Sequence, residues 1–257
     1  MTRKLPFTTI ENLRDFGDYA AGHRHMRKGV LFRSAHQAEA SEEELEALKA
    51  LGLTLIVDLR RPGERERNPS RRWRDFDAEV IVNDHPEEGD DPWQTFMKSA
   101  AITAESMRAY MLTYYDAAPH EPRHIDLYTR WFARLGETEG ATLVHCAAGK
   151  DRTGILCALT HHIAGVHVDD IVADYLLTND EERFARRMPL FAAHVEELTG
   201  ARPDEAAMRT TMGVEAEYLD RAFAVMKARH GSIDNYLRDV LGLDAGRREA
   251  VERRILI

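Results

Sequence analysis

The chain has 257 residues and a formal net charge of −9 at pH 7. This length suffices for one α/β domain with a substantial core, and the acidic balance argues against nucleic acid as a partner. Only two cysteines are present, so no disulfide framework is expected, which indicates a reducing cytoplasm. No run of about eighteen apolar residues predicts a membrane span. The first residues lack the apolar core of a signal peptide, although export without cleavage stays open.

Short apolar runs alternate with helical patterns, which predicts an α/β fold with a mostly parallel central sheet flanked by helices. The first helix begins at a capping box, Ser41 with Glu44, and ends at Leu51 before Gly52. Because repeats and low-complexity linkers are absent, we expect a single domain over residues 1–257. We expect strands at 30–33, 54–59, 79–82 and 142–145, and further helices at 99–115, 125–135, 168–177 and throughout the region from 181 to the end.

The most informative segment follows the last of these strands. It reads His145-Cys146-Ala147-Ala148-Gly149-Lys150-Asp151-Arg152-Thr153-Gly154 and leads into an apolar helix. A strand–loop–helix unit of this kind can surround a tetrahedral oxyanion with backbone amides at a helix N-terminus. We therefore expect Cys146 to lie beneath a phosphate site formed by Ala147, Ala148, Gly149, Lys150, Asp151, Arg152 and Thr153.

The residue types in this loop suit cysteine-based phosphoryl transfer. The thiolate is the nucleophilic form of cysteine, and loop amides, the helix N-terminus and Arg152 would all stabilise it. Attack by Cys146 on phosphorus would form a phosphocysteine that water then hydrolyses. The planar fork of Arg152 can bond two phosphate oxygens, and Lys150 adds positive charge. Gly149 permits a tight turn, and Thr153 could donate its hydroxyl to the departing sulfur.

Two other interpretations of the loop are weaker. A chance cysteine at the end of a buried strand would not require the arginine, threonine and glycines that accompany it. A nucleotide-binding loop would share Gly149 and Lys150. However, Val144 stands where its first glycine belongs, and Asp151 stands where serine or threonine belongs. The segment therefore predicts a cysteine-dependent phosphatase.

Segments outside the loop extend this pattern: Asn12–Asp15, Leu31–Ser34, Asp58–Arg60, Ile171–Leu176, Asn179–Asp180, Gly213–Leu219 and 231–238. With the loop, they resemble the bacterial atypical tyrosine and lipid phosphatases, the family typified by mycobacterial protein tyrosine phosphatase B. The likeness covers nearly the whole chain and is weakest from about 84 to 135. It implies phosphotyrosine activity, often joined by phosphoserine, phosphothreonine and phosphoinositide activity. It also implies a cysteine-dependent phosphatase fold with a helical lid and a helical C-terminal region.

Departure of the tyrosyl or alkyl oxygen needs a general acid. Spacing nominates Asp116, thirty residues before Cys146, because most cysteine phosphatases carry an aspartate on a separate loop at about that distance. However, Tyr114, Tyr115 and Asp116 have the pattern of a helix end, and the resemblance points instead to Asp151 inside the loop. We prefer Asp151 as the catalytic acid, which requires that burial or the phosphate charge keep it protonated near neutral pH. Asp116 stays the alternative.

An apolar stripe with helical spacing runs through Phe184, Met188, Phe191, Val195 and Leu198. By itself the stripe favours a helix packed into the core. The resemblance favours a mobile lid over the active site, and we assign that lid to residues 179–201.

Several arginines could contribute to the field around an anionic substrate. Arg183, Arg186 and Arg187 lie mostly off the apolar stripe, which favours a solvated helix face over a contact with substrate. Seven arginines occur from Arg60 to Arg74. They are either an ion-paired loop or a source of positive potential at the end of the sheet that carries the phosphate loop.

The remaining candidate ligands do not predict a metal or a cofactor. His161 and His162 are adjacent on a helix and cannot share a face, and prolines interrupt the helical spacing of His120 and His124. Cys157 is expected to pack as a small apolar residue. We expect His145, next to the nucleophile, to orient the loop through hydrogen bonds.

These observations predict a metal-free protein-tyrosine phosphatase that also accepts phosphoserine or phosphothreonine and that binds phosphate or vanadate. A phosphoinositide phosphatase using the same residues is the first alternative. A phosphate-binding module without turnover is the second, although the intact Cys146, Arg152 and Thr153 argue against it. A redox enzyme such as an arsenate reductase would need a resolving cysteine, and Cys157 inside a helix suits that role poorly.

Overall fold

The computed structural model describes residues 5–85, 92–99 and 101–257. At its centre lies a five-stranded sheet with the strand order β1-β4-β7-β5-β6. Four strands run parallel, and β1 pairs antiparallel with β4. The α/β prediction is confirmed. The strands are β1 (Arg14–Asp15), β4 (Leu31–Ser34), β5 (Leu53–Asp58), β6 (Glu79–Ile81) and β7 (Ala141–His145), and a separate hairpin consists of β2 (Ala20–Ala21) and β3 (Arg24–His25).

The central strand β7 brings its carboxyl end level with those of its neighbours. His145 lies opposite Ser34 of β4 and Asp58 of β5. All five residues of β7 are buried, because helices cover both faces of the sheet, and this explains its mostly apolar sequence. Open α/β sheets bind ligands at the carboxyl ends of their strands, and the phosphate loop begins there.

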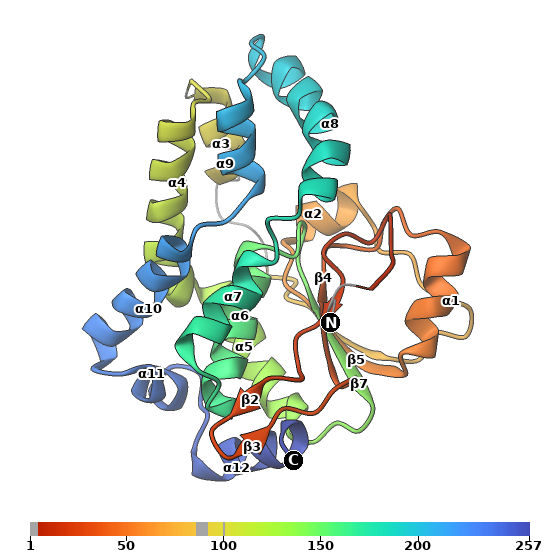
Figure 1. Cartoon of the computed structure of the whole chain (residues 1–257), viewed down its shortest axis with the longest axis vertical. Coiled ribbons are helices and arrows are strands. Elements are labelled where there is room, and N and C mark those ends of the chain that lie inside the picture. Colours follow the sequence, from red (N-terminus) through yellow and green to blue (C-terminus); the bar gives the residue numbers. More distant parts are fainter. Residues whose placement is uncertain (1–4, 86–91, 100) are drawn as a thin grey trace.

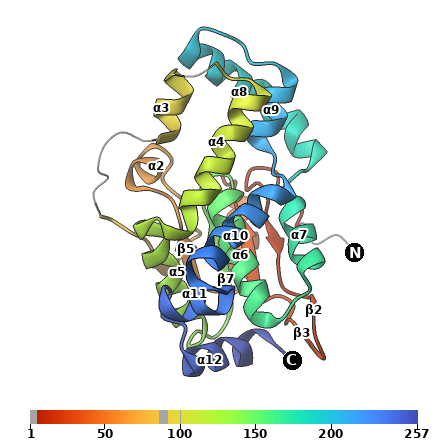
Figure 2. The ribbon, with the colours of Figure 1, turned by 90° about the vertical axis from the view of Figure 1, so that its left-hand side faces the viewer.

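Two hydrophobic cores form on opposite faces of the sheet (Figure 1). The smaller lies under α1 (Glu42–Ala50), which contributes Leu45 and Leu48. The larger lies under helices that stand in front of the sheet in Figure 2. These helices include α5 (Pro122–Leu135), α6 (Asp151–Ala164), α7 (Val168–Leu176), α10 (Ala216–His230), α11 (Ile233–Asp239) and α12 (Ala245–Ile255).

A group of helices extends beyond the sheet at the top of Figure 1. It comprises α3 (Pro92–Ser99), α4 (Ala104–Ala117), α8 (Glu181–Thr199) and α9 (Glu205–Met212). The apolar faces of α8 and α9 form a small cluster of their own from Phe184, Ala192, Met208 and Met212. These two helices therefore share an apolar cluster that is distinct from both main cores, although α9 also packs against α4.

The sequence patterns identify most of the longer elements, but they do not predict β1, β2, β3, α2 (Pro62–Arg67) or α3. The capping box of α1 is confirmed, because Ser41 Oγ accepts from the Glu44 amide at 3.2 Å and Glu44 returns the bond. The helix expected from 99 begins instead at 104, after Thr103 caps it, and the separate α3 precedes it. The arginine-rich segment contains the unpredicted α2. Leu198 is 42% exposed, so the apolar stripe of α8 ends at Val195.

The region from 181 onward is helical as expected, in five helices among the described residues. No helix in the described part of the chain is long and apolar enough to cross a membrane. A 3-10 turn, η1 (Ala118–His120), joins α4 to α5.

Candidate active site

The loop between β7 and α6 is shaped by a glycine. Gly149 has φ +62°, and a Cβ at this position would lie 2.3 Å from the carbonyl oxygen of Ser34 at the end of β4. A left-handed conformation at such close approach requires glycine. The loop therefore curls against β4, with Cys146 only 2% exposed at its start.

The carbonyls of this loop are held by surrounding segments. Gly149 O accepts from Asn12 Nδ2 at 2.8 Å and from Arg33 Nη2 at 3.0 Å, and Ala147 O accepts from the His36 amide at 3.1 Å. By contrast, the backbone N–H groups from 147 to 153 donate to no acceptor within the described residues. Amides without protein acceptors, at the start of a helix, are suited to binding an anion.

A buried ion cluster lies behind the loop. Asp174 of α7 accepts from Arg14 Nε at 3.1 Å and from Arg33 Nη1 at 2.8 Å, and all three side chains are at most 3% exposed. Burial alone would raise the pKa of Asp174, but Arg14 and Arg33 outweigh it and hold that pKa well below its usual range. Two arginines against one carboxylate leave a net positive charge under the loop. Arg33 extends the cluster to the carbonyl of Gly149.

Arg152 is held by Glu64, a residue that sequence reasoning missed. Nη1 and Nη2 of Arg152 donate to the two carboxylate oxygens of Glu64 at 2.6 and 2.8 Å, and Nη1 also donates to Leu59 O at 3.2 Å. A guanidinium has five N–H donors. The donor on Nε and one on Nη2 have no acceptor among the described residues, and these two lie on one edge. That edge is the bidentate face that a phosphate needs.

The pair is largely but not fully buried, and its electrostatics favour the ionised forms. Burial lowers the pKa of Arg152, yet the Glu64 charge outweighs it and the net effect is an increase. Burial likewise raises the pKa of Glu64, and Arg152 outweighs it, so that this pKa falls to about 2. The only sequence signal for Glu64 is its position three residues after Arg61, whose amide it caps at 2.7 Å at the start of α2.

Asp151 begins α6 and faces two groups. Its Oδ1 accepts from the hydroxyl of Tyr115 at 2.8 Å, and its Oδ2 lies 3.6 Å from Lys150 Nζ. Lys150 in turn donates to the carbonyl of Thr211, in α9, at 2.6 Å. Burial lowers the pKa of Lys150, although Asp151 counteracts this. Lys150 thus connects the phosphate loop to the helical unit above it.

The alternative acid is engaged elsewhere. Asp116 forms a bidentate ion pair with Arg221 of α10, at 2.6 and 2.9 Å, and its side chain is 36% exposed. Thr153 is different, because its hydroxyl is buried next to the loop and has no hydrogen-bond partner among the described residues. A hydroxyl in that situation is available to a sulfur or an oxyanion at the site.

His145 is buried beside the loop, with Nδ1 3.7 Å from Asp58 Oδ1. Burial is the main cause that lowers the pKa of His145 to about 4, so the ring is neutral at neutral pH. Asp58 itself is paired with Arg60 at 2.7 Å. Arg60 also donates to Asn68 and Ser70. A neutral, enclosed ring is consistent with an orienting role for His145.

The arginines from Arg60 to Arg74 and those of α8 differ in their surroundings. Arg60 is buried, and Arg65 and Arg71 pair with Asp84 and Glu42, so these three follow the ion-paired interpretation. The expectation of a solvated face on α8 is wrong for Arg183, which is buried. It donates to Glu11 at 3.0 Å and to the carbonyl of Met212 at 3.0 Å. Helix period alone could not reveal this, because one partner, Glu11, comes from the opposite end of the chain and the other, Met212, from the next helix.

Cys157 and the candidate metal ligands are the remaining residues for which the sequence makes a prediction. Burial raises the pKa of the Cys157 thiol to about 12, so this cysteine is unreactive and packs in the main core. In the described ranges, no group of three or more His, Cys, Asp or Glu side chains could hold a metal ion.

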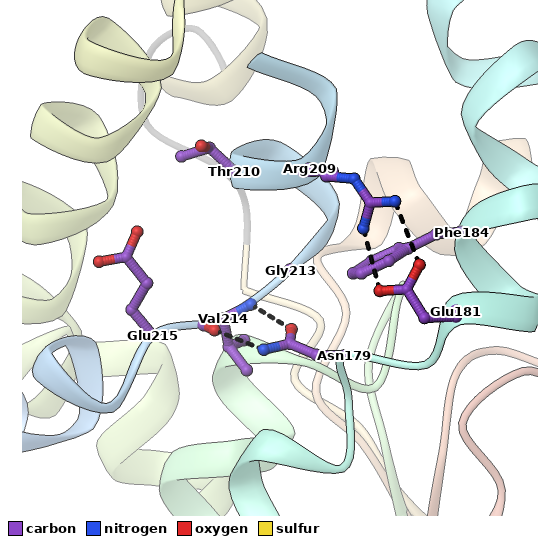
Figure 3. A pocket seen from close by; sticks show the side chains of 8 residues that line it. All are labelled: Asn179, Glu181, Phe184, Arg209, Thr210, Gly213, Val214 and Glu215. Carbon is purple, nitrogen blue, oxygen red and sulfur yellow. Dashed lines mark hydrogen bonds and ion pairs between the residues drawn. The ribbon is translucent and has the colours of Figure 1, made fainter. Parts of the chain in front are cut away.

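A pocket of about 290 Å³ lies beside the helical unit above the loop (Figure 3). Asn179 bonds both backbone groups of Val214 at 2.8 Å, and Arg209 pairs with Glu181. A Cβ on Gly213 would lie 2.8 Å from the carbonyl of Arg209, so this close packing also requires glycine. None of the phosphate-loop residues lines the pocket, whose walls are formed by Asn179, Glu181, Phe184, Arg209, Thr210, Gly213, Val214 and Glu215.

A parallel α/β sheet with an amide-lined Cys-X5-Arg loop at the carboxyl end of its central strand defines a cysteine-dependent phosphatase. A sequence profile of the tyrosine phosphatase family matches residues 5–257. The chain belongs to this family and is a protein-tyrosine phosphatase.

Individual relatives agree with this assignment. A protein of Cupriavidus necator with the provisional name tyrosine-protein phosphatase is 36% identical over 245 residues, which cover 93% of this chain and 85% of the relative. The triple specificity protein phosphatase PtpB of Mycobacterium tuberculosis is 31% identical over 261 residues, covering 89% and 90%. A tyrosine-protein phosphatase of Nostoc commune is 32% identical over a shorter stretch of 148 residues, covering 57% and 47%.

Proposed function

We propose that this phosphatase hydrolyses phosphotyrosine through a phosphocysteine on Cys146, with Arg152 binding the phosphate and Asp151 as the general acid. The observation that carries the proposal is the loop itself. Its amides have no acceptor among the described residues, and the open edge of Arg152 belongs to the same loop as the Cys146 thiol. Such an arrangement stabilises both a thiolate and a phosphate dianion.

The chemistry proceeds in two steps. The sulfur of Cys146 attacks phosphorus while the bond to the tyrosyl oxygen breaks, and Asp151 gives that oxygen its proton. Asp151, now a carboxylate, then accepts a proton from the water that attacks phosphorus, and the sulfur departs as a thiolate. The unpartnered hydroxyl of Thr153 donates a hydrogen bond to the departing sulfur.

The substrate range extends in this proposal to phosphoserine and phosphothreonine. The relative from Mycobacterium tuberculosis, which is named a triple specificity phosphatase, supports a broad range. Phosphoinositide hydrolysis at the same site is the alternative, favoured by the positive charge of Lys150 and of the cluster behind the loop. A panel of phosphopeptides and phosphoinositides, assayed side by side, decides between them.

Because both cysteines are free and buried, we also propose a reducing location, the cytoplasm.

Substitution of the nucleophile and of the two candidate acids tests the mechanism. Cys146→Ser is expected to retain vanadate or phosphate binding and to lose turnover by several orders of magnitude, without a phosphocysteine in rapid quench. Asp151→Asn should slow phosphotyrosine peptides far more than an aryl phosphate with an acidic phenol, because a good leaving group needs little protonation. Asp116→Asn is the matched control and should show no such dependence. Substantial turnover by Cys146→Ser, or the reverse pattern for the two aspartates, would contradict the assignment.

We further propose that residues 179–201, with α9, act as a lid over the loop. The separate apolar cluster of α8 and α9 supports this, as do the polar contacts of Arg183 with Glu11 and of Lys150 with the Thr211 carbonyl, although α9 also packs against α4 and α8 against α3. A lid belongs to the less stable part of a fold. Amide exchange in α8 should therefore be faster than in α6, and vanadate should slow it. Equal protection in both helices, with or without vanadate, would identify α8 as fixed core.

A further inference from the structure

A chain of buried hydroxyl groups ends at Asp151. The hydroxyl of Tyr115 donates to Asp151 Oδ1 at 2.8 Å, and the hydroxyls of Tyr115 and Tyr175 lie 2.6 Å apart. Each phenol has one hydrogen. Since Tyr115 gives its hydrogen to the carboxyl, Tyr175 must be the donor to Tyr115. The three groups come from α4, α7 and the start of α6, so packing of these helices assembles the chain.

The two tyrosines are buried hydrogen-bond donors. Tyr115 is 0% and Tyr175 is 1% exposed. Burial raises the pKa of each phenol well above its ordinary value. The ring of Tyr175 reaches this position only because residue 154 is glycine, since a Cβ there would lie 2.7 Å from the ring. The glycine that ends the phosphate-loop motif therefore serves the approach of Tyr175.

A donor fixed on one carboxyl oxygen decides where the proton of the acid can be. Oδ1 accepts the hydrogen of Tyr115, so a protonated Asp151 carries its own hydrogen on Oδ2. Oδ2 is also the oxygen that lies 3.6 Å from Lys150, within the phosphate loop. We propose that Tyr115, supported by Tyr175, is a positioning residue that fixes the Asp151 carboxyl and directs its acidic proton to the leaving group. This inference rests on the proposed role of Asp151 as general acid.

The inference has a pH signature as well as a rate effect. A hydroxyl that donates to a carboxylate stabilises the ionised form, so its loss should move the basic limb of the pH–rate profile upward. The ionisable groups that interact with Asp151 come from several elements, and in each variant all of them except the removed hydroxyl stay in place. They are Lys150 of the loop, Tyr114 and Tyr115 of α4, Tyr175 of α7 and Tyr218 of α10.

Tyr115→Phe tests the proposal, with Tyr175→Phe as a second variant. Tyr115→Phe should lower kcat for a phosphotyrosine peptide roughly tenfold, the loss of about one hydrogen bond to a charged group. It should lower kcat much less for an aryl phosphate with an acidic phenol, and KM should not change. The basic limb of the pH–rate profile should move up by about one pH unit. Tyr175→Phe should show the same pattern more weakly.

Tyr236→Phe is the matched control. Its buried hydroxyl donates to the carbonyl of Pro119 at 2.5 Å, so the substitution removes a comparable hydrogen bond away from Asp151. It should lower thermal stability without changing leaving-group dependence or the basic limb. If Tyr115→Phe and Tyr175→Phe behave like this control while Asp151→Asn keeps its leaving-group effect, the positioning role is wrong and the acid assignment stands. If Asp151→Asn itself has no leaving-group effect, both are overturned. Tyr115→Phe combined with Asp151→Asn should be no slower than Asp151→Asn alone.

Discussion

Replacing Glu64 by glutamine tests how Arg152 is held. The two oxygens of Glu64 lie 2.6 and 2.8 Å from Arg152, and the side chains are 18% and 15% exposed. The fall in the pKa of Glu64 from 4.5 to about 2 corresponds to roughly 3 kcal/mol of folding stability. Glu64→Gln keeps the shape but leaves the guanidinium without its buried counter-charge, so we expect a loss of about 3 kcal/mol at neutral pH.

The pH dependence has a definite sign. A carboxylate with a lowered pKa stabilises the folded protein fully above pH 4.5, and this contribution is lost as the pH falls toward 2. Urea unfolding should therefore show the full difference between the parent protein and Glu64→Gln at pH 7. At about pH 3.5 the difference should be smaller by about 1.4 kcal/mol.

Activity provides the second readout for this variant. Without Glu64, the open edge of Arg152 is no longer fixed toward the loop, so KM for a phosphotyrosine peptide and the inhibition constant of vanadate should both rise about tenfold. Glu66→Gln, on the exposed side of the same helix, is the matched control and should change neither quantity. An equal loss of stability at both pH values, or an unchanged vanadate constant, would refute the role given to Glu64.

Three further outcomes are expected. Asp174→Asn should cost about 3–5 kcal/mol of unfolding free energy, because two buried arginines lose their counter-charge, whereas Asp169→Asn on the exposed face of α7 should cost little. Gly149→Ala should abolish vanadate binding, while Gly165→Ala, which has φ +82° but open space around it, should only reduce the melting temperature. Activity should survive dialysis against EDTA, since the described residues contain no ligand cluster for a metal, and a requirement for added zinc or magnesium would contradict this.

The local parts of the site could be predicted from the sequence. Cys146, Gly149 and Arg152 lie within seven consecutive residues, so the strand, the loop and the helix that follow one another bring them together without long-range contacts. The capping box of α1 is equally local. The sequence predicts that Cys157 packs in the core because it lies within an apolar helical segment, and its burial confirms this.

The partners of those residues depend on tertiary structure. Glu64 meets Arg152 across 88 positions, and Tyr115 meets Asp151 across 36. Arg33 reaches Asp174 across 141 positions. These pairs require the strand order of the sheet and the placement of α2, α4 and α7 around the loop, neither of which leaves a periodic signal in the sequence. Arg183 shows the same limit. The helical period predicts a solvated position for this residue, whereas in the folded protein Arg183 forms a buried ion pair with Glu11, near the N-terminus.

The sequence by itself therefore determined the chemistry that we propose for this protein, because the proposed nucleophile, the amide-rich loop and its arginine form one contiguous segment. Only the tertiary structure decided how that chemistry is supported. The fold holds Arg152 with Glu64, fixes Asp151 with Tyr115 and Tyr175, and supports Gly149 with Arg33. The physical reason is that buried charges and hydroxyls must find partners wherever the packed elements bring them, and distance along the chain does not constrain that choice.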